Sequence, residues 1–406
     1  MGKSKHSSLA INLLGFKKSI IFLGLLCCAS CGSEEGLPQV GDTPEVGSNA
    51  PTSLPPPESD YEEATFKWGF ADSTGRLVIA AKYDEVRSFG KEGLALVRQN
   101  GRWHFINQRG QQVGQDWRAA WPFREGLARV QSDDDLFGFV NRQGQIVIPA
   151  IFPAAGDFHE GHAWVRNDPG YGLIDSNGQI VIDPQYDKLS NLSRGRLVFE
   201  QDGQYGLRDF SQVIIPPTYD RLTDDGGQLR ARQDKLYGYL QSDGKWQIEP
   251  AYQMASPFVD DRAAVMKDGQ WQLIDLAGQN YLTQDYQQVF SAGEGLWIVE
   301  ASGRYGAVDR GGQLVIALEY DEIQPFSSGL AAYSQNDLWG YLRPDGTQAF
   351  PAEFGLAWPF QGEQARVATR EGFVMIDQAG NIRIRPGYRD MKAFGELGLL
   401  PIQVYR

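Results

Sequence analysis

Three histidines lie beyond the N-terminal segment, and two of them, His159 and His162, flank Glu160 and Gly161. Imidazole and carboxylate groups at short spacing suggest a metal site, but this spacing differs from the pattern of helical metalloproteases. The run falls where the chain passes from a loop into a strand, so the two imidazoles do not converge as they would on a helix. We therefore interpret both histidines, and His104, as surface residues.

Two acidic clusters are the next candidates. Asp133, Asp134 and Asp135 are consecutive, so their side chains point in different directions, unlike the alternating ligands of a calcium loop. We interpret them as a solvated turn. Asp224 and Asp225 lie in the shortest repeat, and this pair and the Asp133–Asp135 turn are where a unique carboxylate site would be found.

Aspartate also follows tyrosine repeatedly, at Tyr83-Asp84, Tyr186-Asp187, Tyr219-Asp220 and Tyr320-Asp321. Paired carboxylates catalyse glycoside hydrolysis, but an active site is normally built once, whereas these pairs occupy one repeated position. They are predicted to cap turns. The sequence contains no nucleophile elbow, phosphate-binding glycine loop or dinucleotide fingerprint. We expect no catalytic residue, no metal and no cofactor.

These residues belong to a repeat with a fixed period. Ten units are separated by 32 to 35 residues, and each begins with an aromatic residue, usually followed by glycine: Trp68, Trp103, Phe137, Tyr171, Tyr205, Tyr237, Trp271, Tyr305, Trp339 and Phe373. A turn glycine follows seven residues later in nine units. A second aromatic lies fourteen or fifteen residues after the first: Tyr83, Trp117, Phe152, Tyr186, Tyr219, Tyr252, Tyr286, Tyr320, Phe354 and Tyr388. Such a period indicates a repeat architecture.

Each unit is predicted to contain three strands. Residues 137–141 form the first, with the aromatic covering the glycine, and a tight turn such as 72–75 follows it. The second strand, as in residues 145–148, is expected to end at Pro149. The third, as in residues 93–97, is joined to the next unit by turns such as Asn100-Gly101, Asp202-Gly203 and Asp268-Gly269. The third strand of one unit should therefore pair with the first strand of the next.

The expected fold is all-β: a tandem array of ten three-stranded antiparallel repeats of about 34 residues. Either an open curved array or a propeller-like ring is compatible with this pattern. Ten units exceed the usual four to eight blades of a propeller, so the open array is slightly favoured. The first aromatic of each unit is expected to pack in the core rather than to form a platform for ligands.

The phased aromatic and glycine positions resemble the WG-repeat family, named for the pair seen at Trp68-Gly69 and Trp339-Gly340. The resemblance covers residues 65–406 and implies a β-repeat fold and an interaction role. Trp103-His104, Trp271-Gln272 and Phe373-Val374 lack the glycine, so these three units are expected to differ locally.

The N-terminus is typical of export. Residues 1–30 contain four lysines and no acid, an apolar run follows, and Cys31 comes after small residues, which resembles a bacterial lipobox with Cys31 as the acylated residue. We predict a lipoprotein signal peptide in residues 1–30, a disordered acidic, proline-rich tether in residues 31–63 and the repeat domain in residues 64–406. All three cysteines lie in the first 31 residues, which excludes disulfides and cysteine chemistry from the repeats.

Composition narrows the partners. The chain has 406 residues and a formal net charge of -13, which argues against nucleic acid. We expect a non-enzymatic binding or scaffold protein, lipid-anchored in the bacterial cell envelope, with a protein, peptide or glycan partner. The alternative is a hydrolase acting on envelope polysaccharide or peptide through carboxylates in a divergent repeat.

Replacement of Cys31 by serine tests the anchor. If Cys31 is acylated, Cys31→Ser should move the protein from the membrane fraction to the soluble fraction and block normal processing. Fractionation and mass spectrometry measure both effects. An unchanged distribution and mass would contradict the lipoprotein assignment.

Overall fold

The computed structural model describes residues 66–384, 387–392, 395 and 398–405. All regular secondary structure in these ranges is β, arranged in ten small antiparallel sheets. The described residues contain no helix long and apolar enough to span a membrane. The signal peptide and tether predicted for residues 1–63 lie outside the described residues.

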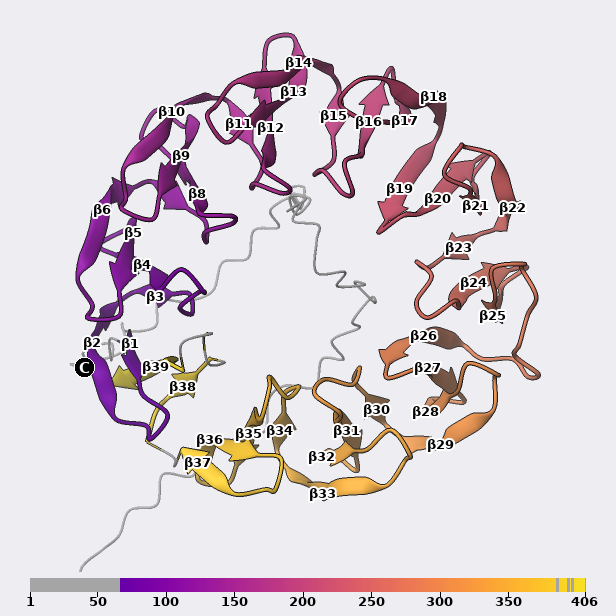
Figure 1. Ribbon diagram of the computed structural model, residues 1–406. Coiled ribbons are helices and arrows are strands. Elements are labelled where there is room, and N and C mark those ends of the chain that lie inside the picture. Colours follow the sequence, from indigo (N-terminus) through magenta and orange to yellow (C-terminus); the bar gives the residue numbers. More distant parts are fainter. Residues whose placement is uncertain (1–65, 385–386, 393–394, 396–397, 406) are drawn as a thin grey trace, which may run out of the picture. The chain divides into compact units, whose positions relative to one another are not determined.

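The ten sheets follow one another around a ring, in chain order (Figure 1). In nearly every sheet a two-residue to six-residue strand lies innermost and a longer strand lies at the periphery. The sheet formed by β3, β4, β5 and β6 is representative, with the strands in that order from the centre outward.

The strands have the following bounds. Innermost are β3 (Glu85–Val86), β7 (Ala119–Ala120), β11 (Ala154–Ala155), β15 (Lys188–Leu189), β19 (Arg221–Asp225), β23 (Met254–Ala255), β26 (Gln288–Gly293), β30 (Glu322–Ile323), β34 (Leu356–Ala357) and β38 (Asp390–Met391). Second are β4 (Leu94–Gln99), β8 (Leu127–Gln131), β12 (His162–Asn167), β16 (Leu197–Gln201), β20 (Gln228–Gln233), β24 (Ala263–Lys267), β27 (Leu296–Ala301), β31 (Ala331–Gln335), β35 (Gln364–Thr369) and β39 (Leu400–Tyr405). Third are β1 (Phe66–Ala71), β5 (Arg102–Asn107), β9 (Phe137–Asn141), β13 (Gly170–Asp175), β17 (Gln204–Arg208), β21 (Leu236–Leu240), β25 (Gln270–Ile274), β28 (Arg304–Val308), β32 (Leu338–Leu342) and β36 (Gly372–Asp377). Outermost are β2 (Leu77–Tyr83), β6 (Gln112–Trp117), β10 (Ile146–Phe152), β14 (Ile180–Tyr186), β18 (Val213–Tyr219), β22 (Trp246–Tyr252), β29 (Leu314–Tyr320), β33 (Gln348–Phe354) and β37 (Ile382–Ile384).

Sheets of four strands, rather than the predicted three, are the rule, and only the sheet of β23, β24 and β25 has three. The extra strand is the segment after the second aromatic, which sequence reasoning treated as a loose connection. In β3, Glu85 and Val86 pair with Arg98 and Val97 of β4. Two residues are enough for this pairing because β4 already forms a regular ladder with β5 on its other side.

The joints between repeats are as predicted. β4 pairs with β5 across the Asn100-Gly101 turn, and both turn residues have positive φ, 52° and 77°. A two-residue turn with both residues in this region matches the right-handed twist of a hairpin. Each sheet therefore takes its two inner strands from the end of one repeat and its outer strands from the start of the next.

The ring is closed, so the favoured open array was wrong. β39 pairs antiparallel with β1 from Tyr405 opposite Phe66 to Leu400 opposite Ala71, completing the sheet β2-β1-β39-β38. The Tyr388 hydroxyl also donates a hydrogen bond to the carbonyl of Gly75. The physical reason is that the last repeat ends with a strand that lacks a partner, and the first repeat begins with a strand that lacks one.

The glycine after the first aromatic has a steric role. A Cβ on Gly138 would lie 2.6 Å from the Ile148 carbonyl oxygen and 2.6 Å from the Ala150 nitrogen. The backbone of the outer strand thus passes directly over the glycine. The same close approach to an outer strand occurs at Gly69, Gly172, Gly206, Gly238, Gly306 and Gly340.

The outer strand continues through proline, contrary to the predicted end at Pro149. β10 runs from Ile146 to Phe152, and its register with β9 shifts between Ile148 and Phe152. Proline is tolerated there because the strand lies at the edge of the sheet and is irregularly paired, so no ladder donor is lost.

Two of the three repeats without this glycine differ in their outer strand, as predicted. β6, opposite His104, is one residue shorter than most outer strands. The sheet containing Gln272 has no fourth strand among the described residues. In these two repeats a side chain at the glycine position is therefore found where the outer strand is short or absent.

The two aromatics of a repeat pair across strands, as Trp68 does with Tyr83 and Trp339 with Phe354. The predicted core position of the first aromatic holds for Trp68, which is 8% exposed, whereas the other nine first aromatics are partly buried and lie at the border of the core. The second aromatic is the more deeply buried of the two, as Tyr83 at 0% exposed shows beside Trp68. Core clusters join neighbouring sheets: one contains Ile79 of β2 together with Val97 of β4.

We expect Gly138→Ala to destabilise the protein by about 1–3 kcal/mol, because the added methyl group meets the β10 backbone, which cannot move aside like a flexible side chain. Chemical denaturation measures the change. Gly355→Ala is the matched control, since the nearest atom to its Cβ lies 3.6 Å away and its φ is not positive. Equal stability of Gly138→Ala and the wild type would contradict this explanation of the glycine.

Candidate functional site

The aspartates that follow tyrosine cap turns, as predicted. Asp187 Oδ2 accepts the backbone N–H of Asp202 at 2.7 Å, and Asp321 Oδ2 accepts that of Asn336 at 2.7 Å. In each case the partner is a residue of the turn that joins the second and third strands. Equivalent contacts join Asp220 to Lys235 and Gln287 to Ser302. Because a neutral glutamine fills the same position, the contact requires an acceptor oxygen and no negative charge.

The Asp133–Asp135 turn is held by arginines. Arg102 contacts both carboxylate oxygens of Asp133, with Nη2 at 3.2 Å from Oδ2, and Arg118 Nη1 lies 2.8 Å from Asp135 Oδ2. The hydrogen bond from Arg102 holds the pKa of Asp133 below its usual value. Two of the three acids are therefore ion-paired rather than merely solvated.

Asp224 and Asp225 are more deeply buried than the acids of the Asp133–Asp135 turn. Asp224 Oδ2 lies 2.8 Å from Arg196 Nη2, and the Asp224 side chain is 6% exposed. Asp225 binds Arg230, with Nε at 3.1 Å and Nη2 at 3.4 Å from its two oxygens. The shortened repeat places these acids at the end of β19, where the tight turn at Gly226-Gly227 leads into β20.

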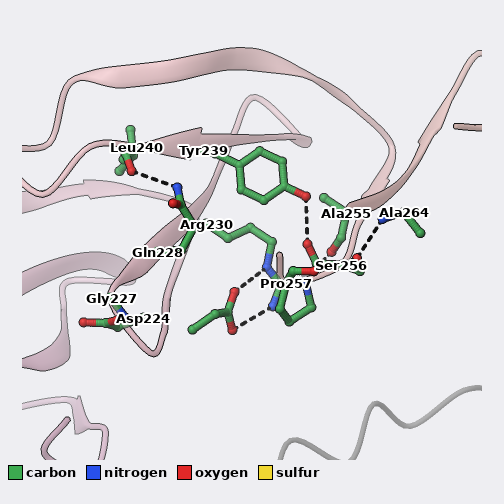
Figure 2. Close-up of polar contacts among 11 residues, drawn as sticks. Asp224, Gly227, Gln228, Arg230, Tyr239, Leu240, Ala255, Ser256, Pro257 and Ala264 are labelled. Atoms are coloured by element: carbon green, nitrogen blue, oxygen red, sulfur yellow. Dashed lines mark hydrogen bonds and ion pairs between the residues drawn. The ribbon is translucent and has the colours of Figure 1, made fainter. Parts of the chain in front are cut away.

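The arginine of this group links two sheets. Arg230 Nη1 donates to the carbonyl of Ala255 in the next sheet, and the Tyr239 hydroxyl donates to the Ser256 carbonyl at 2.7 Å (Figure 2). Burial raises the pKa of Asp225 and of Tyr239. Both Asp225 oxygens face the Arg230 guanidinium, so this carboxylate is occupied with holding the joint between sheets.

The His159–His162 run forms a two-residue turn. The backbone N–H of His159 donates to the His162 carbonyl at 2.8 Å, and the His162 ring packs on Phe210 with centroids 4.7 Å apart. The Glu160 side chain accepts the N–H groups of Arg194 and Gly195, at 2.6 and 2.8 Å, in the next sheet. The acid in this run therefore fixes a neighbouring turn.

Glu125 makes the corresponding contact one sheet earlier, accepting the N–H groups of Glu160 and Gly161 at 2.8 and 2.7 Å. Successive turns are thus tied together by carboxylates. His104 is buried, 3.2 Å from Asp116, and burial lowers its pKa. Its prediction as a surface residue was wrong, because it occupies the glycine position beneath an outer strand. No group of three or more potential metal ligands occurs among the described residues.

A pocket lies where the last full sheet meets the closing sheet. Its volume is about 220 Å³, and its described lining residues are Trp358, Pro359, Gln361, Gln364, Arg366, Met375 and Lys392. The Arg366 guanidinium stacks 3.7 Å from the Trp358 ring centroid, and its Nη1 lies 2.6 Å from Asp390. Lys392 Nζ donates to the Val86 carbonyl at 2.7 Å.

Sequence reasoning missed this pocket. A signal was present, because Trp-Pro-Phe occurs only at residues 121–123 and 358–360, each followed eight residues after the tryptophan by an arginine, Arg129 or Arg366. Arg129 stacks on Trp121 at 4.1 Å, as Arg366 does on Trp358. Lys392 follows β38, the strand that comes next in the chain after β37, and its hydrogen bond to Val86 crosses the ring closure. Cys31, the predicted lipidation site, lies outside the described residues.

A family model described as the WG containing repeat matches five segments of the chain: residues 68–103, 137–168, 171–205, 237–271 and 305–339. The matched segments begin at or near the first aromatic of a repeat. No curated protein matches the chain.

Several solved structures are similar to the chain. A computationally designed protein, Ika8, is 14% identical with a TM-score of 0.35, covering 64% of this chain and 93% of its own. A eukaryotic initiation factor is 10% identical with a TM-score of 0.43, covering 70% and 94%. BamB from Moraxella catarrhalis is 12% identical with a TM-score of 0.33, covering 60% and 87%.

The two acidic clusters should respond differently to substitution. Asp224→Ala leaves the partly buried Arg196 without its partner and should destabilise the protein by about 3 kcal/mol. Asp133→Ala, at an exposed turn, should leave stability unchanged within error. Chemical denaturation of both variants measures the difference. Equal losses would contradict the distinction between a buried joint and a surface ion pair.

Proposed function

We propose that the chain is a non-enzymatic scaffold that binds another protein and is held in the bacterial cell envelope by a lipid on Cys31. The observation that carries the binding role is a repeated apolar surface on the outer strands. Ile146 and Ile180 are each 54% exposed and Leu314 is 49% exposed. Further exposed residues at equivalent positions are Leu77, Val78, Val147, Val181, Val213, Val315 and Ile382.

Such a surface favours protein binding because exposed apolar groups that recur at equivalent positions offer a partner area to bury. The exposed residues lie at the start of the outer strands, next to the turns after the third strands. Several turns carry a fixed aspartate: Asp175 Oδ1 accepts the N–H groups of Asn177 and Gln179 at 2.9 and 2.8 Å. The apolar residues are thus presented by ordered turns, which lowers the entropic cost of binding.

The use of the charged residues also supports a scaffold. Glu125, Glu160, Asp224 and Asp225 all hold turns or neighbouring sheets together. Every oxygen of these four carboxylates is bound by a backbone N–H group or an arginine side chain of the protein itself, which leaves none of them free to contact a substrate. The anchoring part of the proposal rests on the sequence around Cys31 and on the acidic, proline-rich residues 31–63.

Capture from envelope extracts by the full-length protein tests the binding role. We expect a partner whose recovery falls at least about tenfold when Ile146, Ile180 and Leu314 are replaced by serine, since each buried side chain contributes roughly 1.5–3 kcal/mol. The matched control replaces Gln143, Gln179 and Gln313, which are exposed in the adjacent turns, by serine and should retain the partner.

Two outcomes would overturn the proposal. One is recovery of every captured protein equally by the apolar variant and the control. The other is turnover of peptidoglycan, a glycan or a peptide by the purified protein that is lost in Asp133→Ala or in Asp225→Asn, which would establish the hydrolase instead.

A further inference from the structure

The pocket at the ring closure contains hydrogen-bond donors that have no partner among the described residues. Both protein contacts of the Arg366 guanidinium, to Asp390 and to the Met391 carbonyl, run through Nη1. Nη2 and Nε have no partner among the described residues. Lys392 Nζ, which carries three protons, makes one hydrogen bond, to Val86, and lies 4.6 Å from the Trp68 ring centroid.

The charge of the pocket is positive. Arg366 and Lys392 line it, and none of its described lining residues is acidic. Asp390 neutralises one of the two cations from beside the pocket. Burial lowers the pKa of both Arg366 and Lys392, which shows that their charges are incompletely solvated. An anionic group entering this pocket would therefore form charge-assisted hydrogen bonds in a partly desolvated site.

Gln364 also lines the pocket, but its Oε1 is inaccessible to solvent and accepts no hydrogen bond from the described residues. A ligand in the pocket therefore does not contact this oxygen.

The walls of the pocket select the rest of the ligand. Trp358, Pro359 and Met375 are apolar. One face of the Trp358 ring is covered by Arg366 at 3.7 Å, and its neighbour Phe373 meets it edge-on with centroids 5.8 Å apart. The face of Trp358 beneath Arg366 is therefore closed to a sugar ring, and the side chains of Pro359 and Met375 offer no strong hydrogen bond to sugar hydroxyl groups, which disfavours a glycan. An apolar side chain suits these walls better.

We propose that this pocket binds the C-terminal carboxylate of a peptide that ends in an apolar residue. The carboxylate meets Arg366 and Lys392, and the terminal side chain contacts Trp358 and Met375. The volume of about 220 Å³ is below the range of drug-sized pockets, about 300–1,000 Å³, and limits the occupant to a single residue. The inference rests on the proposed scaffold function, for which it names a peptide class.

Binding to the full-length protein is measured by fluorescence polarisation of an N-terminally labelled peptide, Ala-Ala-Leu, with a free carboxylate. We expect saturable binding that weakens at least about tenfold when the peptide is amidated, because a charge-assisted hydrogen bond is lost. Arg366→Gln and Lys392→Met should each weaken binding of the free acid by a similar factor and leave binding of the amide unchanged.

Arg129→Gln is the matched control, since Arg129 makes the same stacking contact with Trp121 and also donates to the next sheet, at the Ala155 carbonyl. It should bind the free acid as the wild type does. If Arg366→Gln unfolds the protein, binding is measured with Lys392→Met instead, and folding is followed by circular dichroism.

Equal affinity for acid and amide, no saturable binding, or equal losses in Arg129→Gln and Arg366→Gln would overturn the pocket assignment. Tighter competition by digalacturonate than by the unlabelled peptide would overturn it in favour of an acidic glycan. The scaffold proposal is judged separately, because partner capture through the outer strands uses Ile146, Ile180 and Leu314, none of which lines this pocket.

Discussion

The structure depends on one constraint, the backbone pairing between the last strand of one repeat and the first strand of the next. β4 and β5 form such a pair. Because repeat and sheet boundaries do not coincide, no repeat completes its own hydrogen bonds. The cores obey the same rule: Phe139 of one sheet and Val165 of the next belong to one cluster. At the ends of the chain the pairing of β39 with β1 is the remaining solution, and the cluster of Ala71, Ile384 and Ile402 forms around it.

Polar side chains are mostly used to hold this arrangement. Asp187 and Asp321 cap turns, Glu125 and Glu160 join successive turns, and Arg230 spans two sheets. Polar residues that recur at equivalent positions of the repeats therefore stabilise the fold. Two groups of residues remain available for binding a partner: the exposed apolar residues on the outer strands, and Arg366 and Lys392 in the pocket at the closure.

Local structure could be predicted where one short segment determines it. Asn100-Gly101 adopts a turn that few other pairs allow, and the unit length revealed the repeats. The inner strand Glu85–Val86 escaped prediction because two residues are too few to show an alternating pattern. Ring closure depends on the angle between successive sheets, which no single repeat displays. The pocket places Trp358 of one sheet against Lys392 of the next. The sequence shows both residues, but it does not show that they line the same pocket.

The sheet that joins the two ends has a consequence for the ancestry and engineering of the chain. Since every sheet is assembled from two repeats in the same way, the junction of β1 with β39 is equivalent to the other junctions, such as that of β4 with β5. A circular permutant opened at Asn100-Gly101, with a short linker from the end of β39 to the start of β1, would retain all ten sheets. Gene duplication can likewise insert a whole repeat without creating a new kind of junction, and only the curvature shared among the sheets has to adjust.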